Sequence, residues 1–362
     1  MGKMINRRDF LVSGSAAAVA LAMTALTGCG SSSSSSSSSA SATAASSQAA
    51  GSTPEKLVFA WEPGASEGKY ENMRNLISDA VSKGAGVPCE AMTTTDYNVC
   101  IEAVNSGQAH YASLGAKEYV ELHKKNPKIE VAWVVSDSEG KLNKVSYHSQ
   151  LVVLEKNANK YKRNGKYTVK AEDIKGKNIS WVELSSTSGY VIPSIVLAKK
   201  FGINADDLGE SGKYAKTVLF GGSHVNSMYN ILDGDADICA IDDTGSANNY
   251  TVVEGELGKV GAVYQIKEGL EAPLDQYAGE KLRVVASYPV PAVPFVVNTD
   301  YVPDDMNKKV VEYMGSKEVY DNTQLFVTEG DETTVSKWDK GQRFIKATDS
   351  YYDDFRKLIG EA

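Results

Sequence analysis

From residue 56 onward, short apolar runs alternate with segments of helical periodicity, and this alternation constrains the fold more than any other feature. The first strands are expected at 56–61, 87–92 and 110–114, and the first helices at 70–83, 96–106 and 118–125. Such alternation predicts an α/β fold with parallel sheets, helices on both sheet faces and ligands at the carboxyl ends of strands.

The pattern restarts in the middle of the chain. A strand at 149–154 leads into further strands at 178–182, 217–220 and 238–241, with helices at 194–201 and up to 232, and a return path through 282–287 and 295–297. About 310 residues exceed one small core, so two lobes are expected. We assign residues 54–149 plus 293–362 to lobe 1 and 150–292 to lobe 2, joined by two hinge crossings around a ligand cleft.

A turn rich in small polar residues lies between the strand at 178–182 and the helix at 194–201. It comprises Ser185–Pro193, and Pro193 should lie near the helix start because it lacks a backbone N–H. A helix N-terminus offers free N–H groups and a partial positive charge, and the Ser and Thr hydroxyls add neutral donors. The turn is therefore a candidate anion pocket that needs no lysine, although an ordinary helix cap would have the same composition.

The first 28 residues have the pattern of an export signal. Lys3, Arg7 and Arg8 precede the apolar, alanine-rich run 10–26, and the sequence 26–29 resembles a bacterial lipobox in which Cys29 is lipidated after cleavage. The segment 6–12 also resembles a twin-arginine signal, so both export routes stay open. Residues 29–53 are almost all Ser, Ala and Gly and predict a flexible tether with a mean reach on the order of 27 Å.

Charge and cysteine content restrict the function further. The formal net charge is −8, and because residues 1–28 carry a net +2, the remaining chain is near −10. An acidic surface argues against a nucleic-acid partner. After Cys29, three cysteines remain in no metal-binding pattern. We favour buried free thiols, with a Cys89–Cys100 disulfide as the alternative, and expect no metal and no cofactor.

Several motifs together resemble the phosphate-, phosphite- and phosphonate-binding lipoproteins of ABC importers, the phosphonate-binding branch of the type II periplasmic binding fold. The motifs are Leu57–Trp61, Thr95-Asp96-Tyr97, Val104–Gly107, Ser113-Leu114-Gly115, Ser186–Tyr190 with Pro193, Gly222-Ser223-His224 and Asp233–Asp237. The resemblance implies a two-lobed clamshell, each lobe a mostly parallel sheet flanked by helices. It also implies a membrane permease as partner, and we expect a monomer anchored by Cys29 to the outer face of the bacterial cytoplasmic membrane.

The resemblance also implies the binding residues. The phosphorus oxyanion is expected to contact Tyr97, Ser186, Thr187, Ser188 and His224. Tyr147 is a weaker candidate, and Asp242 and Asp243 match an acidic loop that meets a ligand amine in some members.

The chain departs from the family pattern at Glu183 and at Leu114-Gly115-Ala116. The role of Glu183 and the identity of the oxyanion therefore stay open.

Two other function classes need to be weighed. An exported phosphoester-processing enzyme would need an activating base or a metal, and the chain has no Gly-x-Ser-x-Gly or His-Glu-x-x-His motif and only four scattered histidines. We therefore expect no catalytic residues. A lipid-anchored sensor ectodomain would share the fold and differ only in its partner.

Overall fold

The computed structural model describes residues 53–63, 67–143, 146–327, 338 and 341–361. The predicted signal peptide, Cys29 and residues 30–52 of the tether lie outside the described residues. Within the described part of the chain, no helix is long and apolar enough to cross a membrane.

Most strands belong to two sheets. In spatial order, the first sheet contains β15 (Phe344–Lys346), β4 (Ile129–Val135), β14 (Phe295–Asn298), β3 (Tyr111–Ser113), β1 (Leu57–Trp61) and β2 (Cys89–Thr93). The second contains β11 (Tyr250–Glu254), β12 (Val263–Ile266), β13 (Lys281–Val290), β5 (Tyr147–Leu154), β10 (Ile238–Asp242), β8 (Asn178–Trp181) and β9 (Thr217–Phe220). A small hairpin pairs β6 (Lys162–Arg163) with β7 (Lys166–Tyr167).

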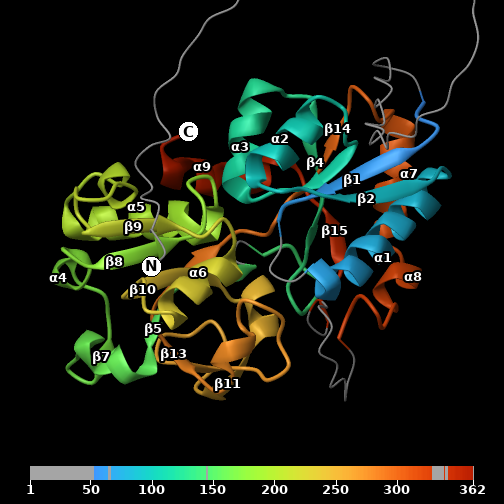
Figure 1. The fold of residues 1–362 in the computed structure, drawn as a ribbon. Coiled ribbons are helices and arrows are strands. Elements are labelled where there is room, and N and C mark those ends of the chain that lie inside the picture. The colour runs from blue at the N-terminus through green and yellow to red at the C-terminus, as the bar shows by residue number, and fades with distance from the viewer. Residues whose placement is uncertain (1–52, 64–66, 144–145, 328–337, 339–340, 362) are drawn as a thin grey trace, which may run out of the picture. The chain divides into compact units, whose positions relative to one another are not determined.

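The helices connect and flank these sheets (Figure 1). They are α1 (Glu67–Ala85), α2 (Tyr97–Asn105), α3 (Ala116–Lys125), α4 (Ala171–Ile174), α5 (Ile192–Phe201), α6 (His224–Leu232), α7 (Asp304–Met314), α8 (Lys317–Tyr320) and α9 (Asp353–Ile359). Asp96 caps α2, since its Oδ1 accepts the amide hydrogen of Val99 at 2.9 Å. Pro193 lies in the first turn of α5, as expected for a residue without an N–H.

The expectation of mostly parallel sheets is wrong in detail. β1 is parallel to β2 and β3, and β8 is parallel to β9 and β10. By contrast, β14 runs antiparallel to β3 and β4, and β5 runs antiparallel to β10 and β13. The physical reason is that β5 and β14 each follow a passage of the chain between the sheets and enter the new sheet against the direction of its βαβ units. β13, antiparallel to β5, runs in the same direction as β10.

In each sheet the connecting helices alternate between faces. The chain passes from β8 outward to β9 through α5 and back to β10 through α6, so right-handed crossovers place α5 and α6 on opposite faces (Figure 1). In the first sheet, Phe59 packs with the α1 residue Ile77, whereas Ala60 packs with the α2 residue Ala103. The carboxyl ends of the parallel strands are therefore left open for a ligand.

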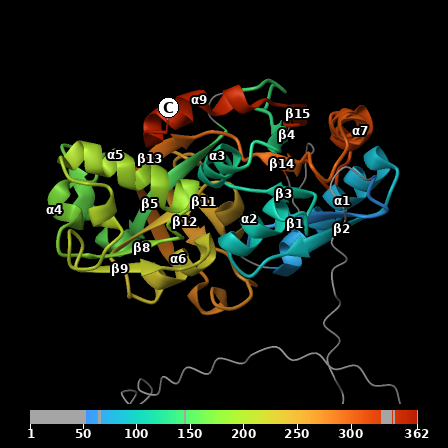
Figure 2. The ribbon, with the colours of Figure 1, turned by 90° about the horizontal axis from the view of Figure 1, so that it is seen from above.

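The chain passes between the two sheets along two adjacent strands. β5 and β13 pair along their length, from Leu154 opposite Leu282 to Tyr147 opposite Val290. The two connections between the sheets therefore lie at the same end of this strand pair, where Tyr147 begins β5 and Val290 ends β13. Figure 2 shows β5 and β13 beside each other and close to α5.

Aromatic rings fill much of the core of the first sheet. Trp133 and Phe295 stack with ring centroids 5.3 Å apart, and both rings are buried. Cys89, Cys100 and Cys239 are free thiols, so the alternative of a Cys89–Cys100 disulfide is wrong and the favoured prediction of free thiols is confirmed. Burial raises the pKa of the Cys89 thiol to about 12, which keeps it protonated at neutral pH.

Candidate functional site

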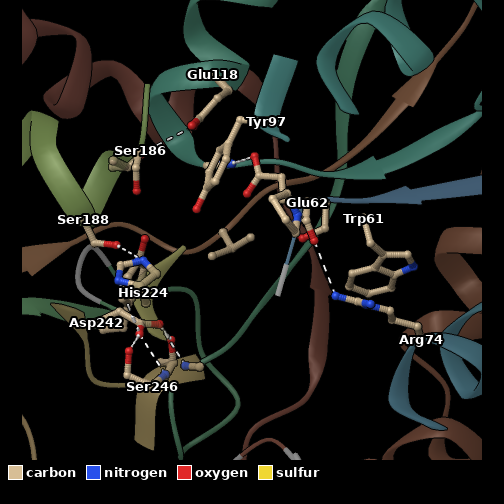
Figure 3. Close-up of a pocket in the computed structure, with 18 of the residues that line it drawn as sticks. Trp61, Glu62, Arg74, Tyr97, Glu118, Ser186, Ser188, His224, Asp242 and Ser246 are labelled. Atoms are coloured by element: carbon tan, nitrogen blue, oxygen red, sulfur yellow. Dashed lines mark hydrogen bonds and ion pairs between the residues drawn. The ribbon is translucent and has the colours of Figure 1, made fainter. Parts of the chain in front are cut away.

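A cavity of about 220 Å³ lies where strands from both sheets end. Glu62 directly follows β1, Gly115 follows β3, Ser186 follows β8, and Asp242 is the last residue of β10. Its lining includes the predicted residues Tyr97, Tyr147, Ser186, Thr187, Ser188, His224 and Asp242, and also Trp61, Glu62, Arg74, Glu118, Thr244 and Ser246 (Figure 3). The fold thus brings seven of the eight predicted binding residues to one cavity.

The turn after β8 presents its hydroxyls because its backbone is tightly held. Ser186 begins a single wide helical turn, Thr187–Val191, that leads into α5, and its Oγ accepts the amide hydrogen of Gly189 at 3.2 Å. A side chain at Gly189 would place its Cβ only 2.3 Å from the Cβ of Val182, so glycine is required there. The Ser188 carbonyl accepts a hydrogen bond from Ser149 of β5 at 2.6 Å, which joins the turn to the strand that enters the sheet.

Ser188, His224 and Asp242 form a chain of polar contacts along one wall of the cavity. His224 is the first residue of α6, and its Nε2 lies 3.4 Å from Ser188 Oγ (Figure 3). On the other side of the ring, Nδ1 lies 3.9 Å from Asp242 Oδ1. With Nε2 facing the cavity, the imidazole is placed to donate a hydrogen bond to an anion.

The Asp242 carboxylate accepts hydrogen bonds from residues of the loop that follows it. It accepts hydrogen bonds from the hydroxyls of Thr244 (2.6 Å) and Ser246 (2.5 Å) and from the amides of Gly245 and Ser246 (both 2.8 Å). Burial by itself raises its pKa, but the charge interaction with His224 and the bonds from Ser246 and Thr244 outweigh burial, so the pKa of Asp242 lies below its ordinary value. Asp242 is therefore an ionised residue beside the His224 ring, and the hydrogen bonds to its carboxylate come from its own loop.

The two predicted tyrosines are neutral donors. Tyr97 is the first residue of α2 and Tyr147 the first of β5, and both rings are buried at the cavity. Burial raises the pKa of both phenols well above the ordinary value, with smaller contributions from nearby carboxylates. Figure 3 shows the Tyr97 ring between Glu62 and Ser186, with its hydroxyl toward the cavity.

Thr187 and Asp243 are placed differently from their neighbours. Thr187 lines the cavity, but its Oγ1 accepts the amide hydrogen of Lys117 at 2.8 Å and lies 3.4 Å from Glu118 Oε2. Asp243 is absent from the cavity lining, because its carboxylate is bonded to His148, at 2.6 Å from the amide and 2.9 Å from Nδ1. Glu183 is also absent from the lining residues.

Sequence reasoning missed three charged residues of the cavity. The Arg74 guanidinium donates to Thr93 Oγ1 at 2.9 Å and to the Glu62 carbonyl at 3.4 Å (Figure 3). Glu62 could have been found, since it directly follows a strand whose carboxyl end is expected to face a ligand. Arg74 and Glu118 lie in helices, where charged residues usually face solvent, and the sequence carries no signal that distinguishes them.

Comparison with known proteins identifies the family of this chain. A family described as "ABC transporter, phosphonate, periplasmic substrate-binding protein" matches residues 59–352. The chain resembles PhnD1 from Prochlorococcus marinus (MIT 9301) in complex with methylphosphonate, with a TM-score of 0.59 and 15% identity over 86% of this chain and 100% of that one.

A binding protein component of an ABC phosphonate transporter from Pseudomonas aeruginosa gives a TM-score of 0.57 and 16% identity, over 84% of this chain and 85% of that one. These likenesses show that the chain has the fold of the type II periplasmic binding proteins. More particularly, because the family match spans most of its length, the chain belongs to the periplasmic substrate-binding proteins of phosphonate ABC transporters. This family consists of exported transport proteins that bind a substrate, and not of enzymes.

Proposed function

We propose that this protein captures a phosphorus oxyanion, either a phosphonate, phosphite or phosphate, in the cavity and delivers it to the permease of an ABC importer. The observation that carries the proposal is the convergence of hydrogen-bond donors on one small space: the neutral hydroxyls of Ser186, Ser188 and Tyr97 and the ring N–H of His224. Directed hydrogen bonds from neutral groups suit a compact tetrahedral anion, because each ligand oxygen accepts several of them.

The roles of these residues can be tested by substitution. Ser186→Ala and Ser188→Ala should each weaken binding of the bound oxyanion by about 1.5–3 kcal/mol, the range for a hydrogen bond to a charged group. Calorimetric titrations with phosphate, phosphite, methylphosphonate and sulfate would identify the ligand and measure the losses. Ser316→Ala is a matched control, since Ser316 caps α8 as Ser186 caps its own turn but lies outside the cavity lining. A parent protein that bound only sulfate would contradict the proposal.

We further propose that Cys29 carries a lipid that holds the protein at the outer face of the cytoplasmic membrane. The support is in the sequence alone: a basic start, an apolar run and a lipobox at 26–29, followed by the tether. Metabolic labelling with a radioactive fatty acid should mark the parent chain and not Cys29→Ser. A labelled Cys29→Ser variant, or an unlabelled parent chain found in the soluble fraction, would exclude this anchor.

A further inference from the structure

Two carboxyl groups, Glu62 and Glu118, face the cavity from the side of the first sheet, opposite the hydroxyls of the turn after β8. Both groups contact Gly115. Glu62 Oε1 accepts the Gly115 amide hydrogen at 3.2 Å, and Glu118 Oε2 would lie 2.1 Å from a Cβ added to Gly115. The two carboxyls therefore meet around one residue at the start of α3, although they come from parts of the sequence 56 residues apart.

One oxygen of this pair has no partner in the described protein. Glu118 is 1% exposed, and its Oε1 is buried without a hydrogen bond, whereas Oε2 faces the Thr187 hydroxyl at 3.4 Å. Figure 3 shows the Glu118 side chain pointing from α3 toward the Ser186 turn, across the cavity from His224. A buried polar atom without a partner is costly, and two partners are available to Oε1: the nearby hydroxyl of Ser185, which lowers the pKa of Glu118, and a ligand atom in the cavity.

The ionisation of the pair decides what that partner is. An anion held by Ser188 and His224 would lie beside two negative charges if both carboxyls were ionised. Burial raises the pKa of Glu118 to about 8, and burial together with the charge of Glu118 raises the pKa of Glu62 well above its ordinary value. At neutral pH the pair therefore keeps at least one proton, and a protonated carboxyl is a hydrogen-bond donor.

The other groups around the pair act in both directions, and burial outweighs those that favour ionisation, which are Lys117 and the hydrogen-bond donors to Glu118. The surrounding groups are Lys117 on α3, Arg74 on α1, Tyr97 and Cys100 on α2, Tyr147 on β5, and His224 and Asp242 across the cavity. Lys117 is paired with Glu121, and Arg74 donates to Thr93 and to the Glu62 carbonyl. Tyr97, Cys100 and Tyr147 are neutral because burial raises the pKa of each. Asp242 is negative and so opposes a second ionisation nearby.

We propose that Glu62 and Glu118 form a second half of the ligand site, a carboxyl pair that keeps at least one proton and donates a hydrogen bond to the bound oxyanion. This inference rests on the proposed function and specifies its ligand class: a phosphorus oxyanion that needs no positively charged group of its own. The alternative is that both carboxyls are ionised and hold an ammonium group of the ligand. Glutamine distinguishes these cases, because it keeps a donor but cannot carry the charge that an ammonium needs.

The experiment is calorimetric titration of the full-length protein with methylphosphonate and with 2-aminoethylphosphonate at about pH 6.5 and about pH 9. Between these two pH values the affinity of the parent for methylphosphonate should fall, and the fall should be about tenfold larger than in Glu118→Gln. The reason is that each pH unit above the pKa of Glu118 reduces its protonated, donating form about tenfold. The ionisation of the ligand affects both proteins alike and cancels in the comparison. At about pH 6.5, Glu118→Gln should weaken binding several-fold at most, and Glu118→Ala by about 10- to 100-fold.

Glu62→Gln provides a second variant if Glu118→Gln does not fold, and it should likewise reduce the fall in affinity at high pH. The inference is overturned if 2-aminoethylphosphonate binds far more tightly than methylphosphonate and Glu118→Gln removes that preference. It is equally overturned if the parent and both glutamine variants show the same pH dependence. Failure of the proposed function is a different result: a parent protein that binds no phosphorus oxyanion at either pH, which would remove the inference with it.

Discussion

The side-chain hydroxyl of Thr187 accepts a hydrogen bond from the backbone amide of Lys117 at 2.8 Å. Thr187 lies in the turn after β8 of the second sheet, and Lys117 lies in the first turn of α3, which follows β3 of the first sheet. The N-cap residue of α3 is Gly115, which has no side chain to satisfy these amides. A residue 70 positions away in sequence therefore caps this helix, and the contact joins the two sides of the cavity.

Removal of this cap should weaken both the fold and ligand binding. Thr187→Val has nearly the same shape but no hydroxyl, and we expect a loss of about 0.5–2 kcal/mol, as for other N-cap deletions. Thr187→Ser keeps the acceptor and should remain close to the parent. Denaturant unfolding and methylphosphonate titration would measure both effects. If the valine and serine variants had the same stability and the same affinity, the hydroxyl would not be the cause of the effect.

Gly115 should tolerate no side chain. An added Cβ would lie 2.1 Å from Glu118 Oε2 and 2.9 Å from Thr187 Oγ1, so Gly115→Ala must displace the carboxyl, the cap or both. We expect a destabilisation of about 1–3 kcal/mol, typical of overpacking. Gly315→Ala is the matched control, because its φ is also negative (−81°) and an added Cβ there would make only ordinary contacts, the nearest at 3.6 Å. Thermal unfolding should show a clearly larger loss of stability for Gly115→Ala. Similar losses in both variants would contradict the tight packing around Gly115.

The stability of the protein should fall as the pH rises toward about 8. The folded state holds the Glu118 proton up to about pH 8, whereas the unfolded chain releases it near the ordinary value of 4.5. Between these values the unfolded state binds fewer protons than the folded state, so the free energy of unfolding decreases with rising pH. Glu62 acts in the same direction.

Glu118→Gln should remove much of this slope, so that the variant gains stability relative to the parent between about pH 5 and about pH 9. Glu312→Gln, which changes an exposed carboxyl on α7, is the control and should leave the slope unchanged. Melting temperatures across this range provide the measurement. If the melting temperatures of the parent and of Glu118→Gln changed in the same way with pH, Glu118 would be ionised in the folded protein at neutral pH.

The neighbouring residues Asp242 and Asp243 should behave differently when each is changed to Asn. Asp242→Asn replaces an acceptor of four hydrogen bonds and removes the negative charge beside the His224 ring, so ligand affinity and stability should both fall, the latter by about 1–3 kcal/mol. Asp243→Asn disturbs the pair with His148 but lies outside the cavity lining, so stability should fall while ligand affinity is kept. A comparable loss of affinity in Asp243→Asn would contradict this placement.

Much of the local structure, and most of the residues that line the cavity, could be predicted from the sequence. Asp96 caps α2 and Pro193 starts α5 because capping and the missing proline N–H are properties of a few adjacent residues. The turn at Ser186–Ser188 could be predicted for the same reason, since a strand, small polar residues and a helix follow one another directly along the chain. The direction of the strands in the sheets could not be predicted in this way, because the antiparallel pairing of β14 depends on where the chain returns after β13.

Which carboxyl groups lie at the cavity depends on contacts between segments that are distant in the sequence. Asp242 and Asp243 are adjacent and chemically identical, yet one faces His224 at the cavity and the other faces His148 behind it, because successive residues at the end of a strand point to opposite sides. Glu118 has the sequence pattern of an exposed helical residue and is nevertheless almost fully buried, because Thr187 and Glu62 reach it from distant segments. Burial and the proximity of charges set the pKa of a carboxyl, and neither is encoded in the residues next to it.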